Sequence, residues 1–230
     1  MFNFRLSLKF LLIEHLLQVS LTFNHNRSPG AIYQDKIYLV NDHNQAEIYD
    51  LNSGTLTNWT SPPQTTGEVP CMITWQDSFL LFGGYLSQMA VQQFNLTTQQ
   101  WRNLSAMPIP RAAFGCSALP NNPDKILLVG GDPVQKSAGI YNPVTDTWES
   151  AASPSIGRKG AAVVQLGNRI FTVGGQDFDL VNTDTTEEYN VATNSWSFVR
   201  GRIVKPKMHF AALVIPMEAV TALPDGCTGI

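Results

Sequence analysis

Short apolar runs closed by turn residues recur along the chain. Three of them end in paired glycines: FLLFGG up to Gly84, ILLVGG up to Gly131 and IFTVGG up to Gly175. A run of four apolar residues is typical of a strand that is buried on both faces. The glycine pairs allow positive φ and the close approach of another backbone, and they are Gly83 and Gly84, Gly130 and Gly131, and Gly174 and Gly175. A fourth run, residues 37–42, ends in Asn and Asp, which tolerate the same backbone best among the other residues. The pattern predicts a series of buried strands that end in tight turns.

Each apolar run is followed by an aromatic residue and then by a tryptophan. The aromatics are Tyr49, Phe94, Tyr141 and Tyr189. The tryptophans are Trp59, Trp101, Trp148 and Trp196, spaced by 42, 47 and 48 residues. The interval from aromatic to tryptophan is seven residues in the last three copies and ten in the first, and it is rich in Asn, Asp and Thr. Such a segment indicates the end of one strand, a tight turn and the start of the next strand.

A basic residue followed by small apolar residues precedes the apolar run in several copies, at Arg27, Arg111, Arg158 and Lys207. Each unit thus contains four short strands. Four hydrophobic residues, a double glycine and a spaced Tyr and Trp resemble the repeat of the Kelch family, over roughly residues 27–223. The first copy lacks the glycines, and the fifth, from Lys207 onward, has only its first strand and a degenerate second one.

The resemblance implies an all-β fold: a Kelch-type β-propeller of four full repeats and a partial fifth. One unit cannot bury both faces of its sheet alone, so successive units must stack. We expect the aromatic residues and tryptophans to fill the space between blades. We expect five loosely closed blades, with residues 20–23 supplying a strand to the fifth; incomplete closure is the alternative. The corresponding division is a leader at residues 1–23, the propeller at residues 24–223 and a tail at residues 224–230.

Composition narrows the function classes. The chain has 230 residues, a net charge of -3 and only 14% charged residues, and its basic residues are scattered singly. A nucleic-acid partner therefore has little electrostatic support. The three cysteines indicate neither a zinc site nor a disulfide framework. We expect Cys71 and Cys116, which fall at equivalent repeat positions, to be small buried residues, while the state of Cys227 stays open. The four histidines have no metal-ligand spacing, so no metal or cofactor is expected.

The N-terminal segment leaves the compartment open. In residues 1–23 two basic residues precede an apolar stretch, as in a secretory signal, but Glu14 and His15 interrupt that stretch. A strand or helix of the fold, or a disordered leader, are the alternatives, and the stretch is too short and polar to span a membrane. N-glycosylation acceptors occur at Asn26, Asn58 and Asn103, which favours secretion slightly over the cytosol.

The first functional hypothesis is a protein-interaction module that binds a macromolecular partner through one face of loops and the mouth of the central channel. The candidate residues for binding this partner, of unknown identity, are Arg111, Arg158, Lys207, His209, Tyr85, Asp132, Gln176, Asp177 and Asp179. The basic ones recur at one point of the repeat and so could form a ring that receives acidic side chains; each could instead cap its own strand. The alternatives are a secreted glycan-binding propeller and a sugar-processing enzyme. No catalytic residue is assigned, because no nucleophile and base could be placed together.

Overall fold

The computed structural model describes residues 22–23 and 27–209, and within them sixteen strands form four sheets. Each sheet is an antiparallel meander of four consecutive strands. The strands of the first two sheets are β1 (Gly30–Tyr33), β2 (Lys36–Val40), β3 (Ala46–Asp50), β4 (Leu56–Asn58), β5 (Cys71–Trp75), β6 (Ser78–Phe82), β7 (Val91–Asn95) and β8 (Gln100–Asn103). Those of the last two are β9 (Gly115–Leu119), β10 (Asn122–Val129), β11 (Ala138–Asn142), β12 (Thr147–Ala151), β13 (Ala162–Leu166), β14 (Arg169–Val173), β15 (Thr186–Asn190) and β16 (Ser195–Phe198). We number these sheets as blades 1 to 4.

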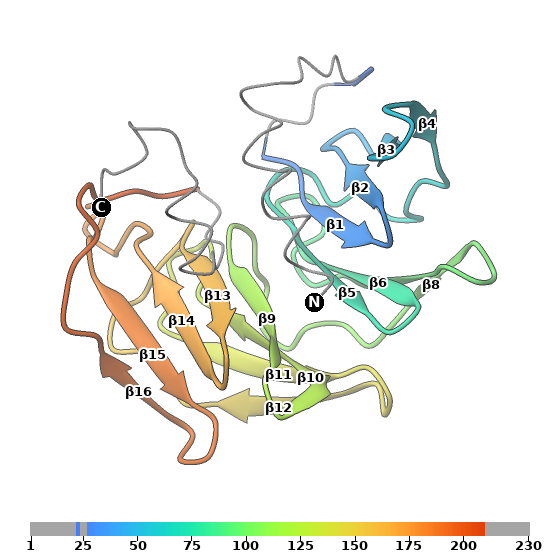
Figure 1. Cartoon of the computed structure of the whole chain (residues 1–230). Coiled ribbons are helices and arrows are strands. Elements are labelled where there is room, and N and C mark those ends of the chain that lie inside the picture. Colours follow the sequence, from blue (N-terminus) through green and yellow to red (C-terminus); the bar gives the residue numbers. More distant parts are fainter. Residues whose placement is uncertain (1–21, 24–26, 210–230) are drawn as a thin grey trace.

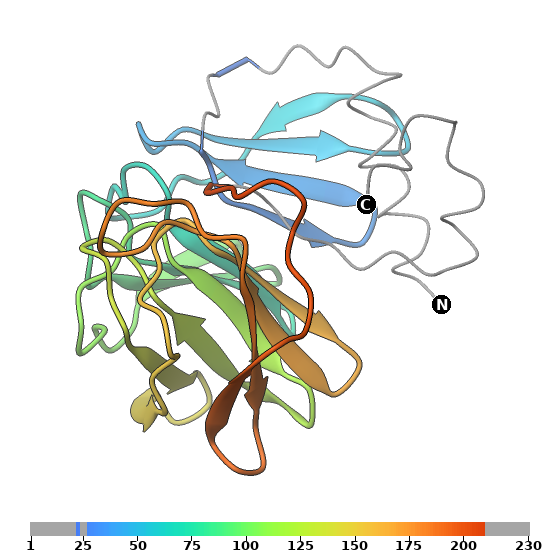
Figure 2. The ribbon, with the colours of Figure 1, turned by 90° about the vertical axis from the view of Figure 1, so that its left-hand side faces the viewer.

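The four blades stand side by side in an arc around a common axis. Figure 1 shows the first strand of each blade, β1, β5, β9 and β13, on the inner side of the arc. Figure 2 shows blade 1, in blue, above the other three blades. This arrangement confirms the predicted all-β propeller with four full repeats.

The second strands of blades 2 and 3 contain fully buried apolar runs. In β6 all residues from Phe79 to Phe82 are 0% exposed, and Ile126, Leu127 and Leu128 of β10 are equally buried. Apolar residues on both sides of these strands pack against neighbouring blades. The continuous apolar runs therefore correspond to strands covered on both faces, as the sequence predicts.

The ring-bearing strands join successive blades. Trp101 faces Phe94, Trp148 faces Tyr141 and Trp196 faces Tyr189 across the third and fourth strands. The indole N–H of each tryptophan donates to a carbonyl of the segment that follows the preceding blade: Thr60 (2.7 Å), Ser105 (3.1 Å) and Ala152 (2.7 Å). The three tryptophans thus lie between blades, as expected.

The first copy differs from the sequence alignment. Leu56, not Trp59, faces Tyr49 across β3 and β4. Trp59 follows β4, and its ring packs against Phe79 and Phe94 of blade 2. Assigning Trp59 as the equivalent of the other tryptophans was wrong, because the position seven residues after Tyr49 belongs to Leu56. Trp59 nevertheless fills the space between blades 1 and 2.

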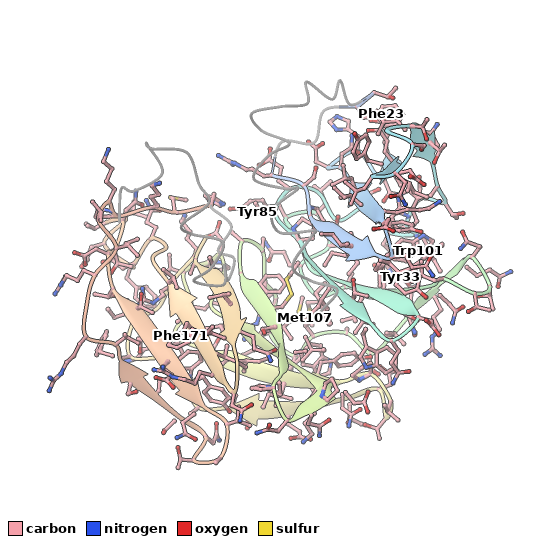
Figure 3. The ribbon with its side chains drawn as sticks, in the orientation of Figure 1. Phe23, Tyr33, Tyr85, Trp101, Met107 and Phe171 are labelled. Atoms are coloured by element: carbon pink, nitrogen blue, oxygen red, sulfur yellow. A yellow bond between two sulfur atoms is a disulfide. The ribbon has the colours of Figure 1, made fainter. Side chains whose placement is uncertain are left out.

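A disulfide connects blades 2 and 3. Cys71 begins β5, Cys116 lies in β9, and their Cα atoms are 6.3 Å apart, within the range that a disulfide spans. Figure 3 shows this bond in yellow on the inner side of the arc. The expectation of two unlinked cysteines was wrong, because the inner strands β5 and β9 of neighbouring blades lie side by side. Their expected equivalence was also wrong: Cys71 pairs with Phe82, directly before Gly83, whereas Cys116 pairs with Leu128, two residues before Gly130. Cys227 lies outside the described residues.

The predicted fifth repeat falls almost entirely outside the described residues. Only residues 207–209 of it are described, and they form no strand. Of residues 20–23, expected to pair with this repeat, Thr22 and Phe23 are described and lie in a bend. The leader and the tail also lie outside the described part, apart from these two residues.

Candidate functional site

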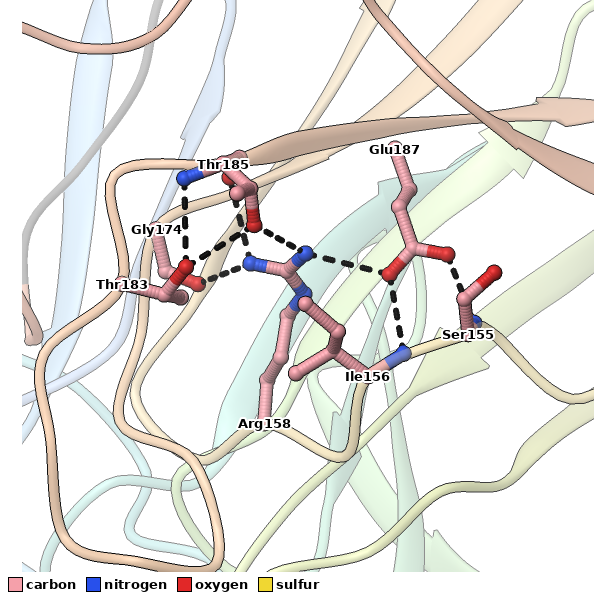
Figure 4. A network of polar contacts seen from close by, with 7 residues as sticks. All are labelled: Ser155, Ile156, Arg158, Gly174, Thr183, Thr185 and Glu187. Atoms are coloured by element: carbon pink, nitrogen blue, oxygen red, sulfur yellow. Dashed lines mark hydrogen bonds and ion pairs between the residues drawn. The ribbon is translucent and has the colours of Figure 1, made fainter.

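The two basic residues Arg111 and Arg158 are buried, with 3% and 1% of their surface exposed. Arg158 donates from Nη1 to the carbonyls of Gly174 (2.7 Å) and Thr185 (3.1 Å), and from Nη2 to the Thr185 hydroxyl (2.8 Å) and a Glu187 oxygen (3.0 Å). Figure 4 shows this network. The guanidinium therefore ties together the ends of β14 and β15 in its own blade.

Arg111 makes the corresponding contacts in blade 3. Its Nη1 donates to the carbonyls of Gly130 and Ser137, and its Nη2 donates to the Ser137 hydroxyl (3.0 Å). Both guanidiniums thus serve the scaffold rather than an open ring of cations. The partner-binding role predicted for them stays untested, and we leave both out of the surface proposed below.

The backbone of the same basic residues locks neighbouring blades together. The N–H of Gly84 donates to the carbonyl of Arg111 (3.1 Å), and Gly131 and Gly175 donate in the same way to Arg158 (2.8 Å) and Lys207 (2.7 Å). The double glycines are needed here because a Cβ at Gly130 would overlap the Arg158 carbonyl, and because this backbone has positive φ.

A chain of backbone hydrogen bonds runs around the inner end of the blades. Val69 donates to Arg27 (3.2 Å), Ala113 to Val69 (2.9 Å), Gly160 to Ala113 (2.6 Å) and His209 to Gly160 (2.7 Å). All five residues have φ between 50° and 62°, so they occupy one equivalent position in successive units. Arg27 therefore corresponds to His209, and its alignment with Arg111, Arg158 and Lys207 was wrong.

Polar side chains gather beside this chain of hydrogen bonds. The Tyr85 hydroxyl donates to an Asp132 oxygen (2.6 Å), and Lys159 Nζ lies 3.7 Å from the other. Arg27 pairs with Glu68 at 3.0 Å. Figure 3 shows Tyr85 towards the inner side of the arc. With His209, these side chains form what we call the axial cluster: Arg27, Glu68, Tyr85, Asp132, Lys159 and His209.

Electrostatics couples the members of the axial cluster. Burial and the hydrogen bond to Asp132 raise the pKa of Tyr85 to about 12. Burial lowers the pKa of His209, and the positive charges of Arg27 and Lys159 lower it further. His209 therefore favours its neutral form at neutral pH. Of the predicted partner-binding residues, the structure brings Tyr85, Asp132 and His209 into this cluster, whereas Arg27, Glu68 and Lys159 were not among them.

Of the other predicted residues, Lys207 is exposed after β16, and Gln176, Asp177 and Asp179 lie in the loop after Gly175. The backbone of Gln176 pairs with Lys159 in both directions, and its side-chain amide donates to the Leu180 carbonyl (3.0 Å). Asp177 accepts from the backbone N–H groups of Asp179 (3.0 Å) and Val181 (2.9 Å). Asp177 thus shapes the loop, while the carboxylate of Asp179 is exposed.

The connections between the second and third strands of each blade, and the connections from one blade to the next, lie at the same end of the blades, which we call the loop face. Large apolar side chains gather there: of the eleven that are exposed among the described residues, eight belong to these connections. They are Tyr85, Leu86, Met89, Ile109, Phe178, Leu180, Val181 and Val204. Val144 lies in a turn and Leu166 is the last residue of β13, both at the opposite end of the blades. Exposed apolar groups concentrated on one face are typical of interaction surfaces.

Several other predictions remain untested. Asn58 and Asn103 are exposed at the ends of β4 and β8, whereas Asn26 lies outside the described residues. In the described part of the chain, no group of three or more His, Cys, Asp or Glu side chains could hold a metal ion. Residues 22–23 and 27–209 contain no helix with the length and apolar character to cross a membrane.

The geometry defines the class of protein: a β-propeller repeat protein whose blades are four-stranded meanders, three of which have a double glycine directly after the second strand. Comparison with known proteins identifies the repeat. A Kelch motif matches residues 157–201, which span the start of blade 4 and its four strands. The chain thus contains a Kelch motif and folds as a Kelch-like β-propeller.

Individual relatives support this assignment. The chain is 25% identical over 141 residues to Kelch-like protein 21 of Rattus norvegicus, covering 61% of this chain and 23% of the relative. It is 30% identical over 203 residues to Kelch-like protein terF of Aspergillus terreus, covering 74% of this chain and 43% of the relative. The chain thus spans less than half the length of these two relatives. The solved structure of YjhT superposes with a TM-score of 0.69 at 17% identity, covering 81% of this chain and 68% of that one, which shows the shared fold.

Proposed function

We propose that this chain is a protein-binding module whose partner docks on the loop face. The observation that carries the proposal is the concentration of exposed apolar side chains there, eight of eleven among the described residues. Leu86 and Leu180, in the loops between the second and third strands of blades 2 and 4, are the most exposed of those in such loops, at 71% and 65%. Kelch-like relatives typically act as protein-binding modules, which supports the same class of function.

The axial cluster lies beside this apolar surface and supplies its polar part. Tyr85 belongs to both, because its ring is 39% exposed and its hydroxyl is held by Asp132. A rigid aromatic ring with a polar end is a frequent anchor in interfaces. His209, Lys159 and Glu68 add charged or titratable groups of both signs, so the surface suits a partner of mixed polarity rather than a polyanion. The proposal assigns no catalytic residue and no cofactor.

The test compares two faces of the same molecule. Partners captured from native extract by the wild-type chain are quantified against those captured by Leu86→Asp/Leu180→Asp. The matched control is Val144→Asp/Leu166→Asp, which changes two exposed apolar residues, at 61% and 48%, at the opposite end. We expect the first variant to lose its specific partner and the control to keep it. Equal capture by both variants, or loss in the control alone, would contradict docking on the loop face.

A further inference from the structure

One position of the repeat carries a buried polar side chain in blades 1, 2 and 4, but a glycine in blade 3. This is the second residue of the third strand: Glu47 in β3, Gln92 in β7, Gly139 in β11 and Glu187 in β15. The three side chains are all 0% exposed. Blade 3 therefore lacks a group that the other blades bury at this point.

These side chains have a common task. Each accepts hydrogen bonds from backbone N–H groups of the segment that leads into its blade. Glu47 accepts from Thr22 (3.1 Å), Gln92 from Gln64 (2.8 Å), and Glu187 from residues 155 (2.6 Å) and 156 (3.1 Å). The position is thus an acceptor site in the interior of the fold. In blade 3 the equivalent segment, residues 107–110, receives no such side chain.

Among the described residues, Arg111 lacks the carboxylate partner that the equivalent arginine of blade 4, Arg158, has. Its three hydrogen bonds match those of Arg158 atom for atom: Nη1 to two backbone carbonyls, and Nη2 to a hydroxyl. Arg158 makes a fourth, from Nη2 to Glu187 (3.0 Å). Within the described part of the chain, Arg111 has no carboxylate partner. A guanidinium provides five N–H donors, and a carboxylate is the acceptor that matches it best.

A cavity occupies the place of the absent side chain. It measures about 330 Å³, and its wall includes Arg111, Gly139, Ser150, Trp148, Met107 and Ile109. This volume is at the lower end of small-ligand pockets, which span about 300–1,000 Å³. Ser150 pairs with Gly139 across β11 and β12, so its hydroxyl lies on the same face of the sheet. Ile109 is part of the loop face and 38% exposed, so the cavity adjoins the surface where a partner would arrive.

Glycine is not required at position 139 by the backbone or by crowding. Its φ is not in the left-handed region, and the nearest atom to a Cβ placed there would be 3.8 Å away, an ordinary contact. The absence of a side chain therefore creates space instead of relieving strain.

Charge favours an anion in this space. Burial lowers the pKa of Arg111 to about 10, so the guanidinium is still protonated at neutral pH. The one acidic residue in the wall is Glu149, whose two carboxylate oxygens both lie 2.8 Å from Lys125 Nζ. Because residues alternate along β12, Glu149 points to the opposite face from Ser150. The positively charged guanidinium of Arg111 thus faces the cavity, and no acidic side chain of the cavity wall neutralises it.

We propose that this cavity binds a carboxylate carried on a short aliphatic arm, which takes the place that Glu187 occupies in blade 4. The carboxylate accepts from Arg111 Nη2 and the Ser150 hydroxyl, and its methylene groups lie against Met107 and Trp148. The carboxylate can belong to a free short-chain acid or to a glutamate side chain of a partner. The inference does not depend on the proposed protein-binding function, because the free acid alone tests it.

The experiment observes the arginine directly. In protein carrying ¹⁵N-labelled arginine, the side-chain Nε–Hε signals of Arg111 and Arg158 are followed during titration with propionate, which equals a glutamate side chain beyond its Cα. Propionamide is the neutral control. We expect the Arg111 signal to shift saturably with propionate and not with propionamide. The Arg158 signal should stay unchanged, because Glu187 already fills its site.

Variants at Gly139 test the mechanism without removing the buried arginine. Gly139→Glu supplies the carboxylate from the chain itself, so we expect propionate to bind on the order of 10- to 100-fold more weakly, the loss of one charged hydrogen bond. Gly139→Ala leaves most of the cavity open and should keep binding. A capped pentapeptide with a central glutamate, with its glutamine version as control, distinguishes a partner's side chain from a free acid as the source of the carboxylate. Tighter binding of the glutamate peptide than of propionate indicates a partner side chain, and tighter binding of propionate indicates a free acid.

Three results would overturn the proposal. The Arg111 signal could fail to respond to either propionate or the glutamate peptide. It could respond equally to propionamide, or Gly139→Glu could bind propionate as well as the wild type does. None of these results bears on docking at the loop face, which the partner-capture experiment tests separately.

Discussion

We expect loss of the buried ion pair between Arg158 and Glu187 to lower the free energy of unfolding strongly. Glu187 is 0% exposed and accepts three hydrogen bonds, from Arg158 and from the backbone of Ser155 and Ile156. Replacing it in Glu187→Ala leaves the guanidinium buried with no carboxylate, and leaves two backbone N–H groups without their acceptor. Removing one partner of a buried ion pair costs about 3–5 kcal/mol.

The size of this effect can be stated as a shift in melting temperature. For a domain of 150–250 residues, 1 kcal/mol corresponds to roughly 2–4 °C, so Glu187→Ala should lower the Tm by about 6–20 °C. The loss should be accompanied by release of the segment before β13, because residues 155 and 156 lose their acceptor. Thermal unfolding followed by circular dichroism gives the first quantity, and hydrogen exchange of these two amides gives the second.

The adjacent residue supplies the control. Glu188 pairs with Arg169 at the surface, where the arginine side chain is 53% exposed. Exposed ion pairs contribute less than about 1 kcal/mol, so Glu188→Ala should change the Tm by only a few degrees, about 4 °C at most. Equal Tm losses in the two variants would refute the reasoning that burial, rather than pairing as such, makes the Glu187 contact costly to lose.

Three more measurements address the disulfide, the glycine turns and the Tyr85 hydroxyl. Cys71→Ser removes the disulfide to Cys116 and should lower the free energy of unfolding by about 2–4 kcal/mol under oxidising conditions. The difference in this free energy between wild type and variant should shrink when both are unfolded in the presence of a reductant. If the difference persists, the disulfide is not its cause. Gly130→Ala should destabilise far more than Gly167→Ala in chemical denaturation, since both glycines have positive φ but only the first would bring its methyl group onto a carbonyl of the next blade; equal losses would exclude that contact. Tyr85 should ionise near pH 12 in a difference absorbance titration against Tyr85→Phe. Because its folded-state pKa is raised, its contribution to stability is present below pH 10 and is lost as the pH rises through about 12, whereas ionisation near pH 10 would contradict the hydrogen bond.

The repeat could be predicted from the sequence because its markers report local structure. The apolar run at residues 79–82 became the fully buried β6, and the seven-residue interval from Tyr141 to Trp148 became a β-hairpin whose two rings lie 4.7 Å apart. Counting the same seven residues from Tyr49 in the first copy leads to Leu56 and not to Trp59, and Leu56 is the residue that faces Tyr49 in the structure. Periodicity thus identifies strands and turns well when the interval is kept constant.

The role of individual side chains was harder to predict, because sequence position does not give the direction of a side chain or its partners. Arg111 and Arg158 recur at one point of the repeat, which suggested a ring of exposed cations, but their guanidiniums turn back onto glycine carbonyls of their own blades. The repeat alignment did not predict the disulfide, because Cys71 corresponds to Gly115 and Cys116 lies one residue further along its inner strand. No sequence pattern indicated a role for Gly139, which becomes apparent only when the third strands of the four blades are compared.

The loop face as the docking surface is the central functional claim, and site-specific cross-linking tests it most directly. A photoreactive amino acid is placed at position 86 on the loop face or at position 144 on the opposite end, both exposed in the folded chain. After irradiation with the captured partner, we predict a covalent adduct from position 86 and none from position 144. An adduct from position 144 alone would contradict the account.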